Sequence, residues 1–549
     1  MNKKLLALLL AATMLFTSLV PVVAQETQEA QEATQPQVTV TLDGQDIDFG
    51  DIVPTLVYDI TYVPQWFFFT LLPEGTVLPD VDMLPLRSTL EPFGFTLEWH
   101  QETRTANILP PHQEAVASNI HMVLTHFMDL WVAGDYEAAQ GLLMPEFYAA
   151  LGAIPLQFHL SGRHGRLMDY TILEVTEAQG LYSAMVHATH EKATVLHNIF
   201  AFEPGMIVGF IPIQVDFEPM LPPEHASYTG EAITIGADTP WALEGLLTIP
   251  ENASEENPVP AIILIPGSGA NNMDASIFQN RPFFDIADYL SSNGVAVLRY
   301  NERAFTHGFA MAQTLGLAQT VYEEYIADAF LAAQILRDDP RISHVFILGH
   351  SLGGIVAPRI AAEAALDGVV IMASSPRPLH LIWYDQSQQH ISDTLDRGDM
   401  DLEAAEAARA LLATQLAEAE AIGTMTPEAL ATTILFDTFP AMYELSIIQS
   451  LPLPFIGRYH TPVLVVQGGR DFQTTVADDF QLFVEGTQGM DHVTLILYDG
   501  LNHLMMPAYR QEGPLVIDVM EYAIPGTVCP EFLADLLAWI MAQVEAFHG

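Results

Sequence analysis

Apolar and polar positions along the chain follow three successive patterns. Between residues 38 and 109, short runs such as VTVTLDGQ and FTLEWHQETRTANIL alternate, which predicts β-strands. From residue 114 to about 150, apolar residues recur at helical spacing, and further alternating runs follow. After the pair Pro222 and Pro223, continuous apolar runs are separated by helical stretches. This last pattern is typical of a mostly parallel sheet that is covered on both faces.

These patterns divide the 549 residues into several folded units, as the length also predicts. We expect a small, mostly β domain at 38–110, a small α+β domain at 113–222 and a doubly wound α/β domain at 226–549. In the α/β domain, the runs EAITIGA and LEGLLTIP are expected to form an antiparallel edge of the sheet. The expected strands after this edge lie at 261–266, 295–300, 345–348, 368–372, 463–467 and 493–498.

The first 24 residues have the pattern of a signal peptide. A basic start with Lys3 and Lys4 is followed by an apolar run at 5–20 and by small residues at 22–24. We expect cleavage before Gln25 and a protein that is secreted or at the bacterial cell surface. A retained anchor is the alternative, although the run is short for a membrane span of about 20 residues. Residues 25–37 are rich in Gln, Glu and Thr and predict a linker.

Charge and cysteine content narrow the function classes. The formal net charge is −49, and lysine occurs only at Lys3, Lys4 and Lys192. Such a chain repels phosphate backbones, so a nucleic-acid partner is not expected. Cys529 is the only cysteine, which excludes an intrachain disulfide and is expected to be a structural thiol.

The candidate nucleophile is Ser351. It lies in Gly349-His350-Ser351-Leu352-Gly353, which fits G-x-S-x-G after an apolar strand and before a helix. The glycines leave room for a strained turn that exposes the serine hydroxyl above the sheet. A serine in an ordinary tight turn is the alternative.

A serine nucleophile needs a base and an oriented carboxylate. Asp471 follows the run PVLVVQGG, and His503 follows VTLILYDGLN, so both lie after the carboxyl ends of expected strands. Asp499 and Asp491 are rival acids, and His492 is a rival base. Asp491 and His492 precede their strand and therefore lie at its opposite end.

Acyl transfer also needs two hydrogen-bond donors for the oxyanion. The backbone N–H of Leu352, directly after the nucleophile, is the first candidate. The loop ILIPGSGANNMD supplies the second, which we assign to the N–H of Ser268, with Gly269 as the next choice. Gly267 and Gly269 let this backbone approach a substrate closely, although a plain glycine turn would have the same sequence.

At these residues the chain from about 226 to 549 resembles the α/β-hydrolase family. It is more closely similar to bacterial secreted or cell-surface esterases through GSG, ADYLSSNGVAVLRYNERA, GHSLGG, PVLVVQGGRDFQ and LNH. The resemblance implies a catalytic triad of Ser351, Asp471 and His503, and no cofactor or metal. Substrate contacts are expected at Gly267, Gly269 and His350. The chain departs from the related pattern Asp-x-Arg-Gly at residues 301–304, which read Asn-Glu-Arg-Ala.

The first domain resembles a stalk domain related to the amino-terminal domain of copper amine oxidases. The matching positions are Val40, Leu42, Asp43, Gly44, Val63, Pro64, Leu86, Arg87, Leu90, Glu91, Gly94, Glu98, Trp99, Glu102, Thr103, Arg104 and Ile108. They contain no copper-ligand cluster, and contact with a cell wall or matrix is the expected role. The α+β domain has a weaker resemblance to small domains that precede secreted hydrolases. His187 and His190 lie three apart on an expected strand and so point to opposite faces, which excludes a shared metal ion.

Residues 380–455 are expected to form a helical cap over Ser351. The apolar side chains of this insertion are expected either to line an acyl pocket or to form the core of the cap; they are Trp383, Tyr384, Phe436, Phe439, Met442 and Tyr443. Leu412, Leu416 and Ala419 share one helical face that is expected to cover the loops above the serine.

The sequence therefore predicts a secreted serine hydrolase that cleaves carboxylic esters through an acyl-enzyme. Ser351 would attack, His503 would transfer protons and Asp471 would orient His503. A thioesterase, acyltransferase or peptidase would use the same residues. A cell-surface binding protein with an inactive hydrolase domain is the alternative from another class.

Overall fold

The computed structural model describes residues 113–548, with gaps at 145–146, 149–150, 152–154, 179–180, 203–205, 399 and 437, together with seven short strands between residues 39 and 109. The predicted signal peptide and linker lie outside the described residues. No helix in the described ranges is both long and apolar enough to cross a membrane.

The described strands of the first domain lie in two small sheets, β2-β1-β7-β6 and β3-β4-β5. Their bounds are β1 (Thr39–Leu42), β2 (Gln45–Asp46), β3 (Thr55–Val57), β4 (Ile60–Pro64), β5 (Met83–Pro85), β6 (Thr96–His100) and β7 (Thr105–Leu109). Strands therefore occur in both of the runs that predicted them. The stalk role of this domain stays a prediction.

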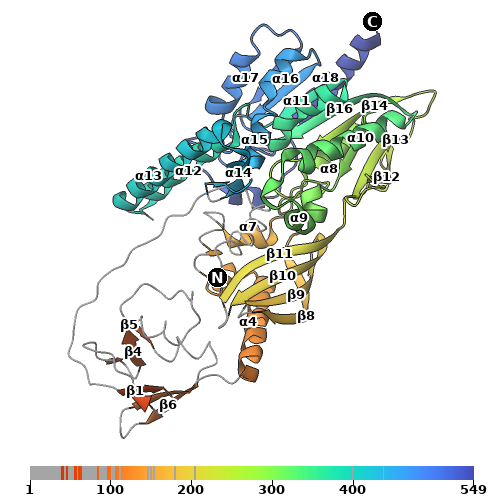
Figure 1. Cartoon of the computed structure of the whole chain (residues 1–549). Helices are drawn as coiled ribbons and strands as arrows, with labels where there is room; N and C mark the ends of the chain where they lie inside the picture. The colour runs from red at the N-terminus through yellow and green to blue at the C-terminus, as the bar shows by residue number, and fades with distance from the viewer. Residues whose placement is uncertain are drawn as a thin grey trace.

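The α+β domain packs helices on one antiparallel sheet (Figure 1). Its elements are α4 (Gln113–Ala133), α5 (Tyr136–Gln140), α7 (Leu156–Ser161), β8 (Leu167–Ala178), β9 (Leu181–His190), β10 (Ala193–Phe202) and β11 (Met206–Phe217), in the strand order β11-β10-β9-β8. Trp131 and Phe127 on α4 are fully buried against the sheet. On β9, His187 is exposed and His190 is buried, so the two side chains point to opposite faces.

The α/β domain is built on a mixed sheet of eight described strands in the order β12-β13-β15-β14-β16-β17-β20-β21. The strands are β12 (Tyr228–Ile235), β13 (Leu243–Pro250), β14 (Val259–Ile265), β15 (Ala296–Tyr300), β16 (Ile342–His350), β17 (Gly368–Met372), β20 (Val463–Gly468) and β21 (Val493–Tyr498). β12 and β13 form the antiparallel edge that was predicted, and β13 is also antiparallel to β15. The remaining pairs, from β15 to β21, are parallel.

Helices cover both faces of this sheet (Figure 1). The helices and short helical segments are α8 (Pro282–Ser292), α9 (Arg303–Thr314), η2 (Gly316–Ala318), η3 (Tyr322–Ile326), α10 (Ala327–Asp338), α11 (Leu352–Ala364), α16 (Pro452–Arg458), η5 (Val476–Phe480), α17 (Gln481–Gly486), η6 (Val519–Ala523) and α18 (Pro530–His548). Ala261 and Ile263 pack against α10 and α11, whereas Ile262 and Leu264 pack against α8 and α18. Burial on both faces explains why the parallel strands are continuous apolar runs.

The insertion between β17 and β20 forms its own small core. It contains α12 (Leu379–Arg397), α13 (Leu402–Glu420), η4 (Ala421–Thr424), α14 (Pro427–Leu430), β18 (Ile434–Leu435), β19 (Phe439–Pro440) and α15 (Ala441–Ile448). α12 and α13 lie side by side and project from the domain (Figure 1). Leu412 and Ala419 of α13 are buried within this insertion, together with Trp383 of α12.

Candidate active site

Ser351 lies at a sharp turn between β16 and α11. Its backbone has a φ of 53° and a ψ of −120°, a conformation that is strained for a residue with a side chain. The flanking glycines are required by close backbone contacts, because a Cβ on Gly353 would press on the carbonyl oxygen of Pro266 and one on Gly349 would press on Gly353. The turn is fixed further by the Ser374 hydroxyl, which donates to the Ser351 carbonyl at 2.6 Å.

Asp471 and His503 form a buried pair beside this turn. The imidazole Nδ1–H of His503 donates to Oδ2 of Asp471 at 2.7 Å, and both side chains are almost fully buried. Asp471 follows β20 and His503 follows β21, so the two residues meet at the carboxyl edge of the sheet as expected. With its proton on Nδ1, a neutral His503 keeps Nε2 free to accept a proton.

The environment of Asp471 keeps it ionised. Burial alone would raise the pKa of this carboxyl, but the His503 ring and hydrogen bonds from Thr474 bring its pKa below the usual value. The Thr474 hydroxyl donates to Oδ2 at 2.8 Å, and the backbone N–H of Gln473 donates to Oδ1 at 2.8 Å. Gln467 adds a further hydrogen bond to Oδ2 at 3.0 Å. The carboxylate is therefore fixed in place as well as charged.

His350 supports His503 from the nucleophile turn. Its Nε2–H donates to the backbone carbonyl of His503 at 2.9 Å, and the centroids of the two rings are 4.7 Å apart. Burial, together with the charge of a protonated His503, lowers the pKa of His350 to about 3. His350 is thus a neutral side chain that orients the histidine loop, and it also lines the pocket in which we expected it to contact substrate.

The rival acid and base residues lie elsewhere. Asp499 and Asp491 are exposed, and His492 bonds the backbone of Ile456 through Nε2 at 3.2 Å. Of the described residues that line the pocket with Ser351, none is one of these three.

The loop after β14 faces Ser351. An added Cβ on Gly267 would lie 2.9 Å from the Ser351 Cβ, so only glycine fits without a shift. The Gly267 carbonyl accepts hydrogen bonds from the Tyr325 hydroxyl at 2.9 Å and from the Asn271 amide at 2.8 Å. Because the N–H and C=O of a peptide unit point in opposite directions, the N–H of Ser268 is directed away from these two partners.

The expected oxyanion residues occupy different positions around the pocket. Gly267 and Ser268 line it together with Ser351, whereas Gly269 is not among the described residues that do. Gly269 has a φ of 84°, which glycine adopts without strain and which turns the chain. Leu352 is the first residue of α11, so its N–H has no acceptor within the helix.

Residues 301–304, which differ from the related pattern Asp-x-Arg-Gly, have a structural role. The Asn301 side chain accepts from the Met273 N–H at 2.9 Å, and the Glu302 carboxyl accepts from the Asn271 N–H at 2.8 Å. Arg303 forms a buried ion pair with Asp328. The segment therefore supports the glycine loop from behind, even though its residues differ from the related pattern.

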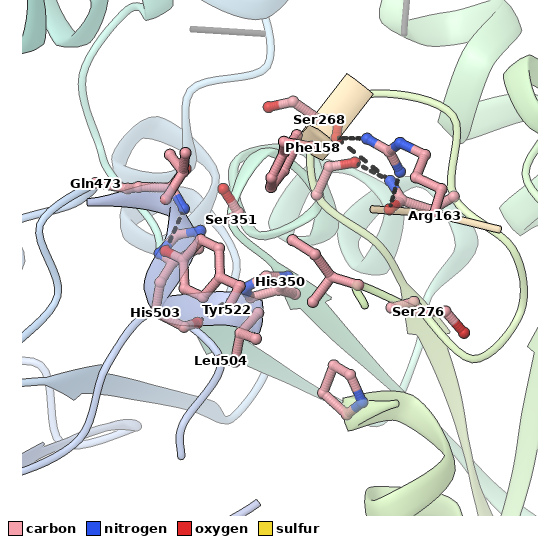
Figure 2. A pocket seen from close by; sticks show the side chains of 16 residues that line it. Phe158, Arg163, Ser268, Ser276, His350, Ser351, Gln473, His503, Leu504 and Tyr522 are labelled. Carbon is pink, nitrogen blue, oxygen red and sulfur yellow. Dashed lines mark hydrogen bonds between the residues drawn. The ribbon is translucent and has the colours of Figure 1, made fainter. Parts of the chain in front are cut away.

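The pocket is closed by segments that the sequence did not indicate. It has a volume of about 800 Å³, counting its part open to solvent. Phe158 and Arg163, from the α+β domain, lie on the side of Ser268, while Gln473 and Tyr522 lie on the side of His503 (Figure 2). No local pattern marks Phe158 and Arg163, because each contacts residues more than one hundred positions later in the chain. Arg163 binds Ala270 and Asn271, and Phe158 packs on Phe278.

The cap does not line this pocket, contrary to one of the two expectations for it. Among the described lining residues, none comes from the insertion. Trp383, Phe436 and Phe439 form the core of the insertion, Tyr384 and Met442 pack against that core, and Tyr443 belongs to the core of the main sheet. The cap reaches the site indirectly, because Gln386 donates to the Gln473 carbonyl at 2.7 Å.

A family model and a curated esterase each match part of the chain. Residues 262–512 match the model of the alpha/beta hydrolase family. The chain is 32% identical over 311 residues to esterase EstD of Thermotoga maritima, an alignment that covers 54% of this chain and 65% of the esterase. The chain thus spans just under two-thirds of the length of that relative.

Solved structures similar to the chain include hydrolases. Est1E from Butyrivibrio proteoclasticus is 15% identical with a TM-score of 0.35, and the match covers 57% of this chain and 99% of Est1E. A puromycin-hydrolyzing peptidase of Mycobacterium tuberculosis is 14% identical with a TM-score of 0.35, covering 66% of this chain and 46% of the peptidase. Residues 262–512 therefore match the model of the alpha/beta hydrolase family, and they lie in the domain that is built on the mixed sheet.

Proposed function

We propose that the protein is a serine esterase that hydrolyses carboxylic esters through an acyl-enzyme. The observation that carries the proposal is the strained Ser351 turn, which shares one pocket with the hydrogen-bonded pair of His503 and Asp471. The identity to esterase EstD supports an ester substrate.

The reaction follows from the positions of these groups. Ser351 Oγ attacks the ester carbonyl carbon while its proton passes to Nε2 of His503. Asp471 stabilises the imidazolium that forms, and the N–H groups of Ser268 and Leu352 donate to the oxyanion. The C–O bond to the alcohol then breaks, and the alcohol leaves with the proton from His503. A water molecule, activated by His503, attacks the acyl-enzyme, and breaking the Oγ–C bond releases the acid.

Labelling with a fluorophosphonate tests the nucleophile. The wild-type protein should become labelled at Ser351, and the Ser351→Ala variant should remain unlabelled and lose hydrolysis of p-nitrophenyl acetate. Ser392→Ala, in α12 of the cap, is a matched control because it removes a serine far from the pocket. Labelling of Ser351→Ala to the wild-type extent would refute the assignment.

We also propose that the protein is secreted and that its first domain contacts a cell wall or matrix. This part of the proposal rests on the amino-terminal pattern at residues 1–24 and on the resemblance of residues 38–110 to a stalk domain. Expression of the full chain in a bacterial host, followed by amino-terminal sequencing of the exported protein, should give Gln25 as the first residue. An uncleaved chain in the cytosol would contradict this part alone.

A further inference from the structure

The α+β domain contacts the oxyanion loop through one cationic side chain. Arg163 lies directly after α7, and its Nη1 donates to the carbonyl of Ala270 at 2.6 Å and to Oδ1 of Asn271 at 2.7 Å. Its Nη2 is 3.4 Å from the carbonyl of Ser268. Figure 2 shows these bonds running from Arg163 to the loop at the wall of the catalytic pocket.

Arg163 and Asn271 together bind the four successive carbonyls at the start of this loop, at residues 267–270. Asn271 donates to the carbonyl of Gly269 at 2.6 Å as well as to that of Gly267. Ser268 and Ala270 are the carbonyls that Arg163 binds. With four successive carbonyls directed to these donors, the intervening amide groups are turned toward the opposite side.

The loop needs such support because its own sequence allows many conformations. Gly267 and Gly269 have few steric restrictions, so the isolated loop would sample orientations in which a carbonyl faces Ser351. A guanidinium is suited to fixing it, because it is planar and presents several N–H donors in fixed directions. Pre-orientation of the donors is what makes an oxyanion site effective.

The domain boundary around Arg163 contains an apolar cluster. Val195 and Phe217 of the α+β domain pack against Met273 and Phe305 of the hydrolase domain. The backbone N–H of Phe278 also donates to the carbonyl of Gly162, next to Arg163, at 2.5 Å. Arg163 is therefore held in position by both domains.

The buried carboxyl of Glu302 lies near the guanidinium of Arg163. Burial and the nearby Glu324 raise the pKa of Glu302 well above its ordinary value, which disfavours its negative charge. Burial also lowers the pKa of Arg163, so its role at the loop rests on its hydrogen bonds to the loop and not on its charge.

We propose that Arg163 is a positioning residue for the oxyanion loop and that the α+β domain, with Phe158 as a pocket wall, is an integral part of the catalytic centre. The inference rests on the proposed esterase function. It assigns a catalytic contribution to a domain that precedes the hydrolase fold in the sequence.

The test compares Arg163→Gln with the wild-type full chain on p-nitrophenyl acetate. Because removal of one oxyanion donor reduces kcat by about 10²–10³-fold, disordering the loop should lower kcat at least about tenfold with little change in KM. The inhibition constant of phenylboronic acid, which forms a tetrahedral adduct with the serine, should rise by the same factor as kcat/KM falls. Arg163→Lys keeps the charge but not the planar set of donors and should recover only part of kcat.

Gln279→Ala is the matched control. It removes a hydrogen bond across the same domain boundary, from Gln279 to Glu191 at 3.2 Å, without contact to the loop. The control should keep kcat and the phenylboronic acid affinity. If Arg163→Gln does not fold, as its melting curve would reveal, Arg163→Lys decides the question through the same two constants.

Failure of this inference can be distinguished from failure of the proposed function. An active wild-type protein whose Arg163 variants match Gln279→Ala in kcat and inhibitor affinity would overturn this inference alone. A wild-type protein without esterase activity or fluorophosphonate labelling would overturn the proposed function.

Discussion

The side chains of Asp471 and His503 come from loops after adjacent parallel strands, and they meet in a 2.7 Å hydrogen bond between Oδ2 and Nδ1. This bond sets the tautomer of the imidazole, because the carboxylate only accepts. The proton transfer that we propose depends on this contact.

Asp471→Asn should reduce kcat about 10³–10⁴-fold, because an amide nitrogen that faces Nδ1 favours the tautomer with its proton on Nε2. Asp499→Asn, after the next strand, is the control because Asp499 is exposed and outside the pocket. Steady-state kinetics with p-nitrophenyl acetate give both values. Equal activities of the two variants would exclude Asp471 from the triad.

Phe158→Ala should shift substrate preference toward bulkier esters, because Phe158 lines the pocket and its ring packs edge to face on Phe278 at 5.7 Å. Phe439→Ala, in the core of the cap, should lower stability by about 3 kcal/mol as other buried Phe→Ala changes do, without moving that preference. The measurement is kcat/KM over a series of acyl lengths, with melting temperatures for both variants. If Phe439→Ala changed the preference for acyl length and Phe158→Ala did not, the cap and not Phe158 would determine specificity.

Gly267→Ala should impair catalysis, because the new methyl group would lie 2.9 Å from the Cβ of Ser351. Either the serine or the loop must move, and both belong to the proposed machinery. Gly423→Ala is the control, since a Cβ there meets nothing within 4 Å. Fluorophosphonate labelling rates of the two variants should differ strongly, and equal rates would show that the loop tolerates the shift.

Stability should depend on the ionisation of Asp285. Burial, helped by the neighbouring Asp288 and Asp274, raises the pKa of Asp285 to about 6. A carboxyl whose pKa is higher in the folded than in the unfolded chain favours the folded state when protonated, so this contribution is lost as the pH rises from about 4 to about 6.

Asp285→Asn should remove that loss and raise the melting temperature above pH 6, because the amide stays neutral. Its oxygen can still accept from the Val528 N–H, which lies 2.9 Å from the carboxyl in the wild type. Below about pH 4 the two proteins should melt alike. A melting-temperature difference that is independent of pH would contradict the raised pKa.

The sequence predicted those parts of the molecule that depend on local patterns. The buried parallel strands were predictable because both of their faces pack, which makes them continuous apolar runs. Ile262 and Ile263, for example, contact opposite helical layers. The sharp turn at Ser351 was predictable because the glycines around it are required by backbone contacts. The proximity of Asp471 and His503 was predictable because strand carboxyl ends share one edge of the sheet.

The pocket walls depend on packing between distant segments and were not predictable in the same way. Nothing near Arg163 in the sequence indicates that it reaches Ala270, since that contact arises only from the docking of two domains. The helical face of Leu412 and Ala419 is buried as expected, but it packs within the insertion and not on the loops above Ser351, so that part of the prediction was wrong. An apolar periodicity identifies a buried face and leaves its partner open.

The apolar cluster between the two domains limits how the chain can be shortened. A truncated chain that starts at residue 226 would expose Met273, Ala304 and Phe305, which pack against the α+β domain in the full chain. Such a fragment would carry an aggregation-prone surface and an oxyanion loop without Arg163. Domain exchange would meet the same restriction, so the two domains are expected to be engineered as one unit.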